Sequence, residues 1–244
     1  MTFGTCGLPS RITSRGNEIL HGPVAFTVET AAVPVPFGPA APVVQSTAPG
    51  KVVWRASDES RGLGLDVTST MEADGCLTFA ADLKALRDQD IADVRLDLPI
   101  RRETATYLMG INHDGGLRKP NWEWKWGGQI YYDSFWIGDY DAGMQLELRG
   151  ASYCGPMVNL YWNLGQLKPP TTWDNGGKGG VTVKEQGDVV TASAYCGERL
   201  LKAGEDLTLE FALLITPITP LDTASHFTTR YYHNSNGPLY TPHA

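Results

Sequence analysis

The sequence has no apolar run long enough to cross a membrane. Its longest runs, such as residues 211–215, are the size of a strand, whereas a membrane-spanning helix needs about 20 apolar residues. Residues 1–15 contain Thr, Gly, Pro, Ser and Arg and not the continuous apolar core of a secretory signal. We therefore expect no membrane association, while a signal removed ahead of residue 1 stays open.

Basic residues are also scarce. The 244-residue chain has 20 Lys and Arg against 27 Asp and Glu, a formal net charge of −7, and its pI is about 5.2. An acidic surface repels phosphate backbones, so the composition argues against a nucleic-acid partner. Hydrophobic residues make up 42% of the chain, which is ordinary for a globular domain that buries most of its surface without a metal or disulfide.

Several motifs of catalytic and metal sites are missing. The sequence contains no GxSxG, HExxH or P-loop pattern, and its five histidines lie far apart. No two cysteines form a CxxC pair, which argues against a zinc ribbon. Buried free thiols and one or two disulfides remain open alternatives for the four cysteines, Cys6, Cys76, Cys154 and Cys196. We predict no cofactor, with a structural Ca²⁺ ion as the one open alternative.

Alternation of apolar and polar residues is the dominant pattern that is present. It is clearest at residues 94–100, 144–148 and 207–213, and shorter examples recur along the chain. Such alternation predicts strands with one buried face and one wet face. Together with 27 Gly and 16 Pro, it predicts an all-β fold, a jelly-roll-like sandwich of two antiparallel sheets with at most one or two short helices. Residues 82–93 are predicted as either one of these helices or a loop.

We predict one domain over residues 1–233, because no linker separates two independent patterns. Residues 31–49 carry five prolines and few charges, so they are predicted as an extended surface loop. Residues 234–244 hold Asn, Ser, Gly and Pro and are predicted as a flexible tail.

An aromatic segment in the middle of the chain carries the most information about function. Trp122, Trp124 and Trp126 stand at period two, so in a strand all three indoles share one face. Tyr132 and Trp136 follow closely. Indoles stack on the C–H faces of sugar rings, so the segment predicts a carbohydrate platform. The alternative is that these aromatics fill the core between two sheets, which is the commoner place for any single tryptophan.

Asp139 and Asp141 complete the carbohydrate-binding candidates. They flank Tyr140 in the stretch WIGDYDAG. The two carboxylates have three possible roles. They could be ligands of a Ca²⁺ ion or the acid and nucleophile of a glycosidase. They could also belong to a hairpin turn and accept hydrogen bonds from backbone amides. We favour the turn, because Gly and Asp are turn formers first.

Longer stretches resemble a known family. They are TYLMGINHDGG (106–116), WEWKW (122–126), DSFWIGDYDAGMQLELRG (133–150) and LLITPITPLDTASHFTTRYYH (213–233), with further agreement at 7–24. They resemble the β-sandwich module that precedes the catalytic barrel in glycoside hydrolase family 123, which is β-N-acetylgalactosaminidase-like, and in related bacterial proteins. The resemblance covers almost the whole chain.

The resemblance implies a non-catalytic role. In that family an Asp-Glu pair on a (β/α)₈ barrel assists the substrate's own acetamido group, and such a barrel needs about 200 or more further residues. No catalytic residue is therefore carried over to this chain. The resemblance implies an accessory domain that binds or positions glycan, with a glycan or a (β/α)₈ catalytic domain as its partner and an extracellular or periplasmic location.

Two other functions stay open, because fold alone never establishes activity. One is a structural sandwich without a sugar site, which self-assembles into a homo-oligomer or packs on a partner. The other is a stand-alone glycoside hydrolase that uses carboxylates such as Asp133, Asp139 and Asp141. The exposure of the indoles at 122–126 bears on the choice, since exposed indoles form a platform and buried ones belong to the core.

Overall fold

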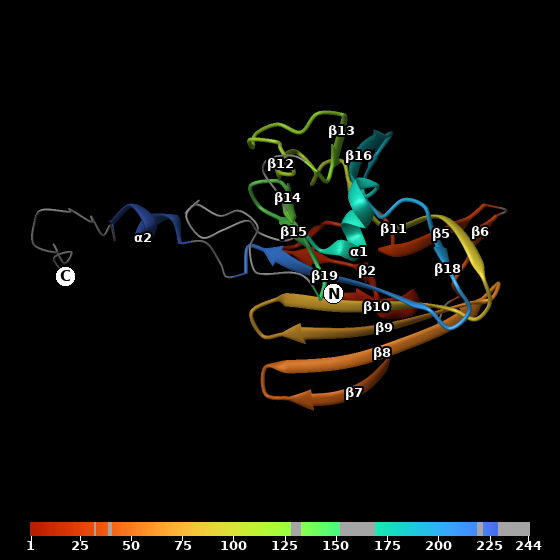
Figure 1. Cartoon of the computed structure of the whole chain (residues 1–244). Helices are drawn as coiled ribbons and strands as arrows, with labels where there is room; N and C mark the ends of the chain where they lie inside the picture. The colour runs from red at the N-terminus through yellow and green to blue at the C-terminus, as the bar shows by residue number, and fades with distance from the viewer. Residues whose placement is uncertain (32, 39–40, 128–132, 152–168, 219–221, 229–244) are drawn as a thin grey trace, which may run out of the picture.

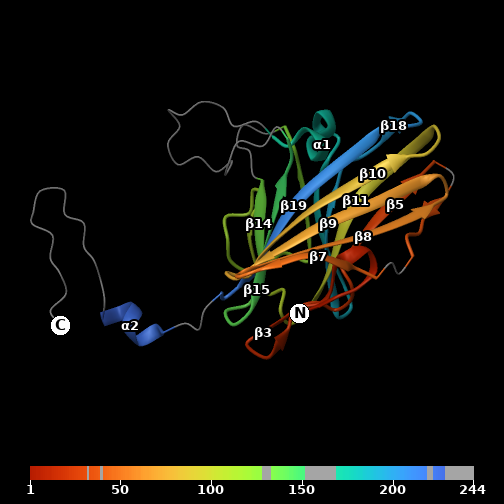
Figure 2. The same cartoon turned by 90° about the horizontal axis from the view of Figure 1, so that it is seen from below.

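Two large antiparallel sheets face each other in the computed structural model, which describes residues 1–31, 33–38, 41–127, 133–151, 169–218 and 222–228 (Figure 1). Within these residues the first sheet has eight strands. Their spatial order is β12 (Tyr107–Gly110), β14 (Ser134–Gly138), β15 (Gly143–Arg149), β19 (Asp206–Thr216), β10 (Cys76–Ala85), β9 (Leu63–Glu72), β8 (Lys51–Ser60) and β7 (Val43–Ala48). Figure 2 shows the long strands of this sheet side by side.

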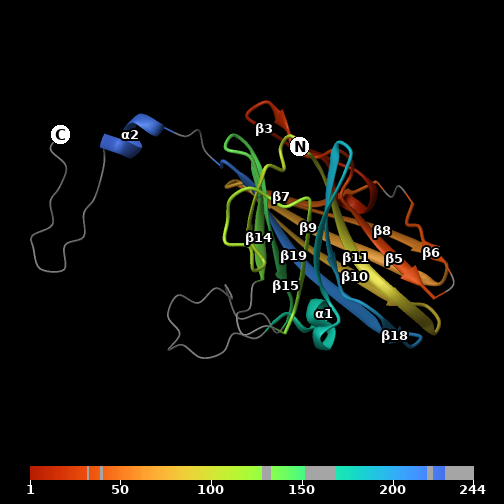
Figure 3. The same cartoon turned by 90° about the horizontal axis from the view of Figure 1, so that it is seen from above.

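The second sheet has seven strands among the described residues. Their order is β13 (Asn121–Lys125), β16 (Gly180–Gln186), β17 (Val189–Tyr195), β11 (Gln89–Arg101), β5 (Ala25–Thr30) and β6 (Pro34–Val35), with β18 (Arg199–Leu201) also paired to β11. Figure 3 shows β5, β6 and β11 from the opposite side to Figure 2. Among the described strands the chain passes from one sheet to the other after β6, β10, β11, β12, β13, β15 and β18.

Short elements complete the described chain. They are the paired strands β1 (Thr2–Phe3) and β2 (Pro9–Arg11), the paired strands β3 (Thr13–Ser14) and β4 (Asn17–Glu18), the 3-10 turns η1 (Thr5–Gly7) and η3 (Asn175–Gly177), and the helices α1 (Thr171–Asp174) and α2 (Thr223–Thr228). Over the described ranges, no helix has the length and apolarity to span a bilayer.

The core lies between the two sheets and follows directly from the alternation in the sequence. In β11, Val94, Leu96, Leu98 and Ile100 are all at most 1% exposed, and every second residue in β10 and β19 is similarly buried. The rings of Phe26 on β5 and Phe211 on β19 meet edge to face, with centroids 5.9 Å apart, and so join the two sheets. The prediction of a two-sheet antiparallel sandwich is confirmed.

Two local predictions were wrong. Residues 31–49 do not form a loop throughout, because they contain β6 and β7. Both are edge strands, where proline is tolerated because one side of the strand makes no ladder hydrogen bonds. Residues 82–93 form neither a helix nor mainly a loop. β10 continues to Ala85 and β11 begins at Gln89, so good helix formers here sit in strands whose partners outweigh local propensity.

Three cysteines are free thiols in the structure: Cys6, Cys76 and Cys196. Burial raises the pKa of Cys196 to about 12 and that of Cys6 to about 11, so both thiols stay protonated at neutral pH. The fourth, Cys154, and the predicted tail at 234–244 lie outside the described residues.

A tryptophan ring fixes the hairpin between β14 and β15. A Cβ added at Gly143 would lie 2.5 Å from Cζ2 and 2.8 Å from Cε2 of Trp136. We predict that Gly143→Ala lowers the free energy of unfolding by about 1 to 3 kcal/mol, because the extra carbon overpacks this contact. Urea denaturation measures the change.

Gly64→Ala in β9 is the matched control. Its added Cβ would meet Glu59 Cγ at 3.8 Å, an ordinary contact, and we expect a change within about 0.5 kcal/mol. Equal effects of the two substitutions would contradict the packing described here.

Candidate functional site

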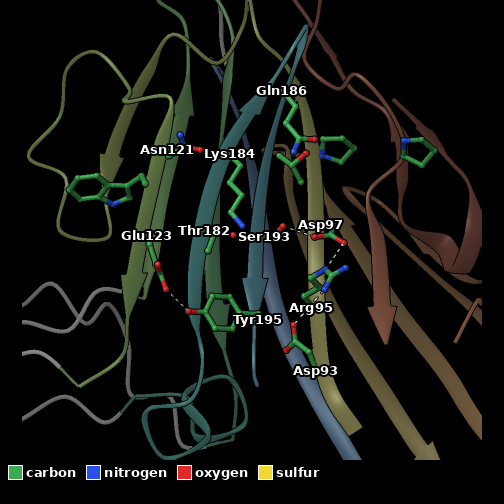
Figure 4. Close-up of a pocket in the computed structure, with 14 residues that line it drawn as sticks. Asp93, Arg95, Asp97, Asn121, Glu123, Thr182, Lys184, Gln186, Ser193 and Tyr195 are labelled. Atoms are coloured by element: carbon green, nitrogen blue, oxygen red, sulfur yellow. Dashed lines mark hydrogen bonds and ion pairs between the residues drawn. The ribbon is translucent and has the colours of Figure 1, made fainter. Parts of the chain in front are cut away.

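A polar groove of about 930 Å³ lies on the outer face of the seven-stranded sheet (Figure 4). It exists because side chains of β13, β16, β17 and β11 alternate between the core and this face. The residues that line it are Pro23, Asp93, Arg95, Asp97, Pro99, Asn121, Trp122, Glu123, Thr182, Lys184, Gln186, Thr191, Ser193 and Tyr195. Most of the residues that line the groove therefore carry charged or hydrogen-bonding side chains.

The strand register arranges these side chains in rows that run across the sheet. Lys184 on β16 lies opposite Asn121 on β13 and opposite Thr191 on β17. In the next row Thr182 is flanked in the same way by Glu123 and Ser193. Residues far apart in the sequence thus become direct neighbours on one face.

The half of the groove on β11 is held together by its own contacts. Asp97 accepts hydrogen bonds from Thr27 Oγ1 at 2.7 Å, from Ser193 Oγ at 2.5 Å and from Arg95 Nε at 3.3 Å. Arg95 also pairs with Glu29 at 2.9 Å and with Asp93 at 3.7 Å. These polar groups satisfy one another, which fixes this side of the groove.

The charged groups in this half of the groove also shift one another's pKa values. Burial raises the pKa of Asp93, although its hydrogen bond from the Gly197 amide and the nearby Arg95 oppose the shift. Burial alone would lower the pKa of Arg95, but its contacts with Glu29 and Asp97 outweigh burial and raise it. The guanidinium stays charged and keeps its carboxylate partners in place.

Tyr195 supplies an aromatic ring in the groove. A Cβ added at Gly180, its cross-strand neighbour, would lie 2.7 Å from the Tyr195 hydroxyl and 2.9 Å from Cζ. The ring therefore lies over Gly180, and its hydroxyl reaches to 3.5 Å from Glu123 Oε1. Burial and the Glu123 carboxylate raise the pKa of Tyr195 to about 12, so the phenol remains a hydrogen-bond donor at neutral pH.

The opposite half of the groove, on β13 and β16, is different, because four of its polar side chains have no partner among the residues that the structure describes. Within the described residues, the side chains of Asn121, Thr182, Lys184 and Gln186 make no hydrogen bond or ion pair. Figure 4 shows Lys184 beside Thr182 and Ser193 on the floor of the groove. This half offers donors and acceptors that are free to meet a ligand.

The predicted indole platform is only partly at the surface. Trp124 and Trp126 are 8% and 4% exposed and pack edge to face at 4.7 Å. They point into the core because β13 closes one edge of the sandwich, so their faces are closed to a sugar ring. Trp122 is half-buried, donates from Nε1 to the Ile111 carbonyl at 3.1 Å and borders the groove.

The remaining aromatic candidates do not join this site. Trp136 belongs to β14 in the other sheet, where its Nε1 donates to Thr216 Oγ1 at 2.9 Å. Tyr132 lies outside the described residues. The structure therefore does not bring Trp122 and Trp136 together on one surface.

Asp139 and Asp141 sit in the turn between β14 and β15, as the favoured interpretation predicted. Asp139 Oδ1 accepts a hydrogen bond from the Tyr140 amide at 2.5 Å, and the Asp139 amide donates to the Ala142 carbonyl at 2.7 Å. Asp141 pairs with Arg15 at 3.2 Å. Over the part of the chain described, no three His, Cys, Asp or Glu side chains gather as metal ligands would.

Sequence reasoning missed most of the groove. Only Asn121, Trp122 and Glu123 lie in or beside the predicted segment, whereas Arg95 and Asp97 fall on the wet face of the strand predicted at 94–100 and Lys184 lies outside the strands singled out from the sequence. The signal was present, since each lies at an outward position of an alternating strand. What the sequence does not show is the register that aligns them.

The fold and the groove define an all-β sandwich with a ligand-sized polar surface on one sheet. A family model described as glycoside hydrolase 123, third domain, matches residues 1–217. The chain belongs to this family, which confirms the family resemblance; the position of the module ahead of a barrel stays a prediction. No curated protein sequence matches the chain.

Solved structures that match this chain share little sequence with it. The Slr1438 protein from Synechocystis sp. PCC 6803 is 10% identical, with a TM-score of 0.47 over 86% of this chain and 88% of that one. A galactose mutarotase related enzyme from Lactobacillus acidophilus is 8% identical, with a TM-score of 0.48 over 86% and 91%. A heparan sulfate lyase HepC mutant from Pedobacter heparinus is 5% identical, with a TM-score of 0.41 over 85% of this chain and 24% of that one.

The burial of Trp124 predicts a large cost for its removal. We expect Trp124→Ala to lower the free energy of unfolding by about 3 to 5 kcal/mol, because it leaves a cavity under β13. Tyr140, which is 78% exposed at the turn, provides the control, and Tyr140→Ala should change stability by less than about 0.5 kcal/mol. A small effect at Trp124 in guanidinium denaturation would show that the indole is not part of the core.

Proposed function

We propose that this chain is a non-catalytic accessory domain of a carbohydrate-active protein and that it binds glycan in the groove of the seven-stranded sheet. The observation that carries the proposal is the set of unpaired polar side chains on β13 and β16 beside the ring of Tyr195. Membership of the glycoside hydrolase 123 third-domain family supports the association with carbohydrate.

The chemistry of the groove fits a saccharide. Sugar hydroxyls both donate and accept hydrogen bonds, and the amides of Asn121 and Gln186 and the hydroxyl of Thr182 do the same. A sugar ring also has an apolar face, which the Tyr195 ring is placed to cover. The Arg95 network holds the floor rigid, so little ordering cost opposes binding.

The same proposal includes a catalytic partner and a location. The domain would present or position glycan for a (β/α)₈ catalytic domain, which the family context supports. We place it outside the cytoplasm, in an extracellular or periplasmic setting, where such proteins meet polymeric glycans.

Glycan binding is the direct test. We expect the purified chain to bind at least one class of oligosaccharide on a glycan array and Tyr195→Ala to weaken that binding at least about tenfold, because the ligand loses an aromatic contact. Tyr107→Ala is the control, since Tyr107 is an exposed tyrosine on β12 in the other sheet. If no glycan binds while the chain forms a defined oligomer in light scattering, the structural sandwich without a sugar site replaces this proposal.

Catalysis is tested separately. We expect no release of the aryl group from an aryl β-N-acetylgalactosaminide by the purified chain. Asp139 is engaged by the turn amide and Asp141 by Arg15, so neither is placed as a free acid or nucleophile. Turnover that disappears in Asp139→Asn but persists in Asp114→Asn would instead establish a stand-alone hydrolase.

A further inference from the structure

Lys184 is a cation surrounded by neutral hydrogen-bonding groups. Across the sheet its direct neighbours are Asn121 and Thr191, with Cβ atoms about 4.5 to 5.5 Å away by strand geometry. Along β16 its neighbours on the same face are Thr182 and Gln186, about 7 Å away. None of the four carries a charge, and Lys184 forms no ion pair with any described residue.

The carboxylates of the groove are already engaged. Asp97 and Asp93 are held by Arg95, and Asp97 also by Thr27 and Ser193. Asp97 lies two strands and one row from Lys184, so their Cα atoms are about 12 Å apart by strand spacing. Its charge is compensated by the Arg95 guanidinium at 3.3 Å, which reduces its repulsion of an anion at Lys184.

Glu123 is a further acidic side chain that lines the groove. It lies diagonal to Lys184, opposite Thr182, at about 7 to 8 Å. Its carboxylate is directed toward other groups, at 3.7 Å from Lys125 Nζ and 3.5 Å from the Tyr195 hydroxyl. Among the described residues, no carboxylate therefore pairs with the Lys184 ammonium, although the net charge of the protein is −7.

We infer that the groove takes an acidic glycan, with a carboxylate or sulfate of the saccharide bound at Lys184. The inference rests on the proposed function, because it names the ligand class of the same groove. The ammonium supplies three donors, and the amides of Asn121 and Gln186 and the hydroxyls of Thr182 and Thr191 surround it with more. Such charge-assisted hydrogen bonds to an anionic oxygen are stronger than those to a neutral hydroxyl.

The test compares ligands that differ only in charge. One pair of probes is a hexagalacturonate and its carboxyl-reduced form, and a second is a sulfated chondroitin hexasaccharide and its desulfated form. We expect the wild-type chain to bind at least one acidic probe about tenfold more tightly than its matched neutral form in calorimetry at 50 mM NaCl. The preference should shrink at 300 mM NaCl, because salt screens the charge.

Substitution of Lys184 separates the charge from the rest of the groove. Lys184→Gln should lose the preference and bind the acidic and neutral forms with equal affinity, and Lys184→Arg should keep the preference. Lys51→Gln, on the other sheet and paired with Glu72, should behave as wild type. Circular dichroism and melting curves confirm that each variant is folded.

The outcomes distinguish this inference from the function on which it rests. Equal wild-type binding of both forms in each pair, or a preference that survives in Lys184→Gln, overturns the acidic ligand and leaves glycan binding intact. Binding of no probe while a neutral glycan of the array still binds overturns the acidic ligand alone. Binding of no probe and of no glycan on the array, or undiminished glycan binding by Tyr195→Ala, overturns the proposed function and the inference with it.

Discussion

The two-residue period of β11 is the constraint on which both the core and the groove depend. Val94, Leu96 and Leu98 enter the core, so Arg95 and Asp97 between them must face outward. A slip of one residue would exchange the two faces and bury a guanidinium and a carboxylate in an apolar interior. Hydrophobic burial along β11 therefore fixes where the polar side chains of the groove stand, and the partners β5 and β17 inherit that register.

Much of the fold could be predicted because alternation is a local property. The strands at 94–100, 144–148 and 207–213 stand out without knowledge of their partners. Residues 82–93 could not be placed in this way, since Leu83, Lys84 and Ala85 favour a helix locally. In the structure Leu83 and Lys84 pair with both β9 and β19, and Ala85 pairs with β9. Likewise, prolines at 31–49 exclude a central strand but not an edge strand, and only the assembled sheets show which positions are edges.

The site was harder to predict for a related reason. The spacing of Trp122, Trp124 and Trp126 correctly indicates a shared face, but Glu123 and Lys125 between them are compatible with that face being either wet or buried. The groove residues come from four strands, and their proximity depends on long-range register. Charge pairs such as Arg95 with Glu29, from sequence positions far apart, carry no local signature that a single sequence reveals.

The groove and the core share strands but, apart from Trp122, not side chains. On β16, Val181 and Val183 pack inward while Thr182, Lys184 and Gln186 face outward. Changes at the outward positions leave the packed interior untouched and cost little stability. Evolution or protein engineering can therefore substitute these outward residues one at a time and change what the groove recognises, while each variant along the way stays folded.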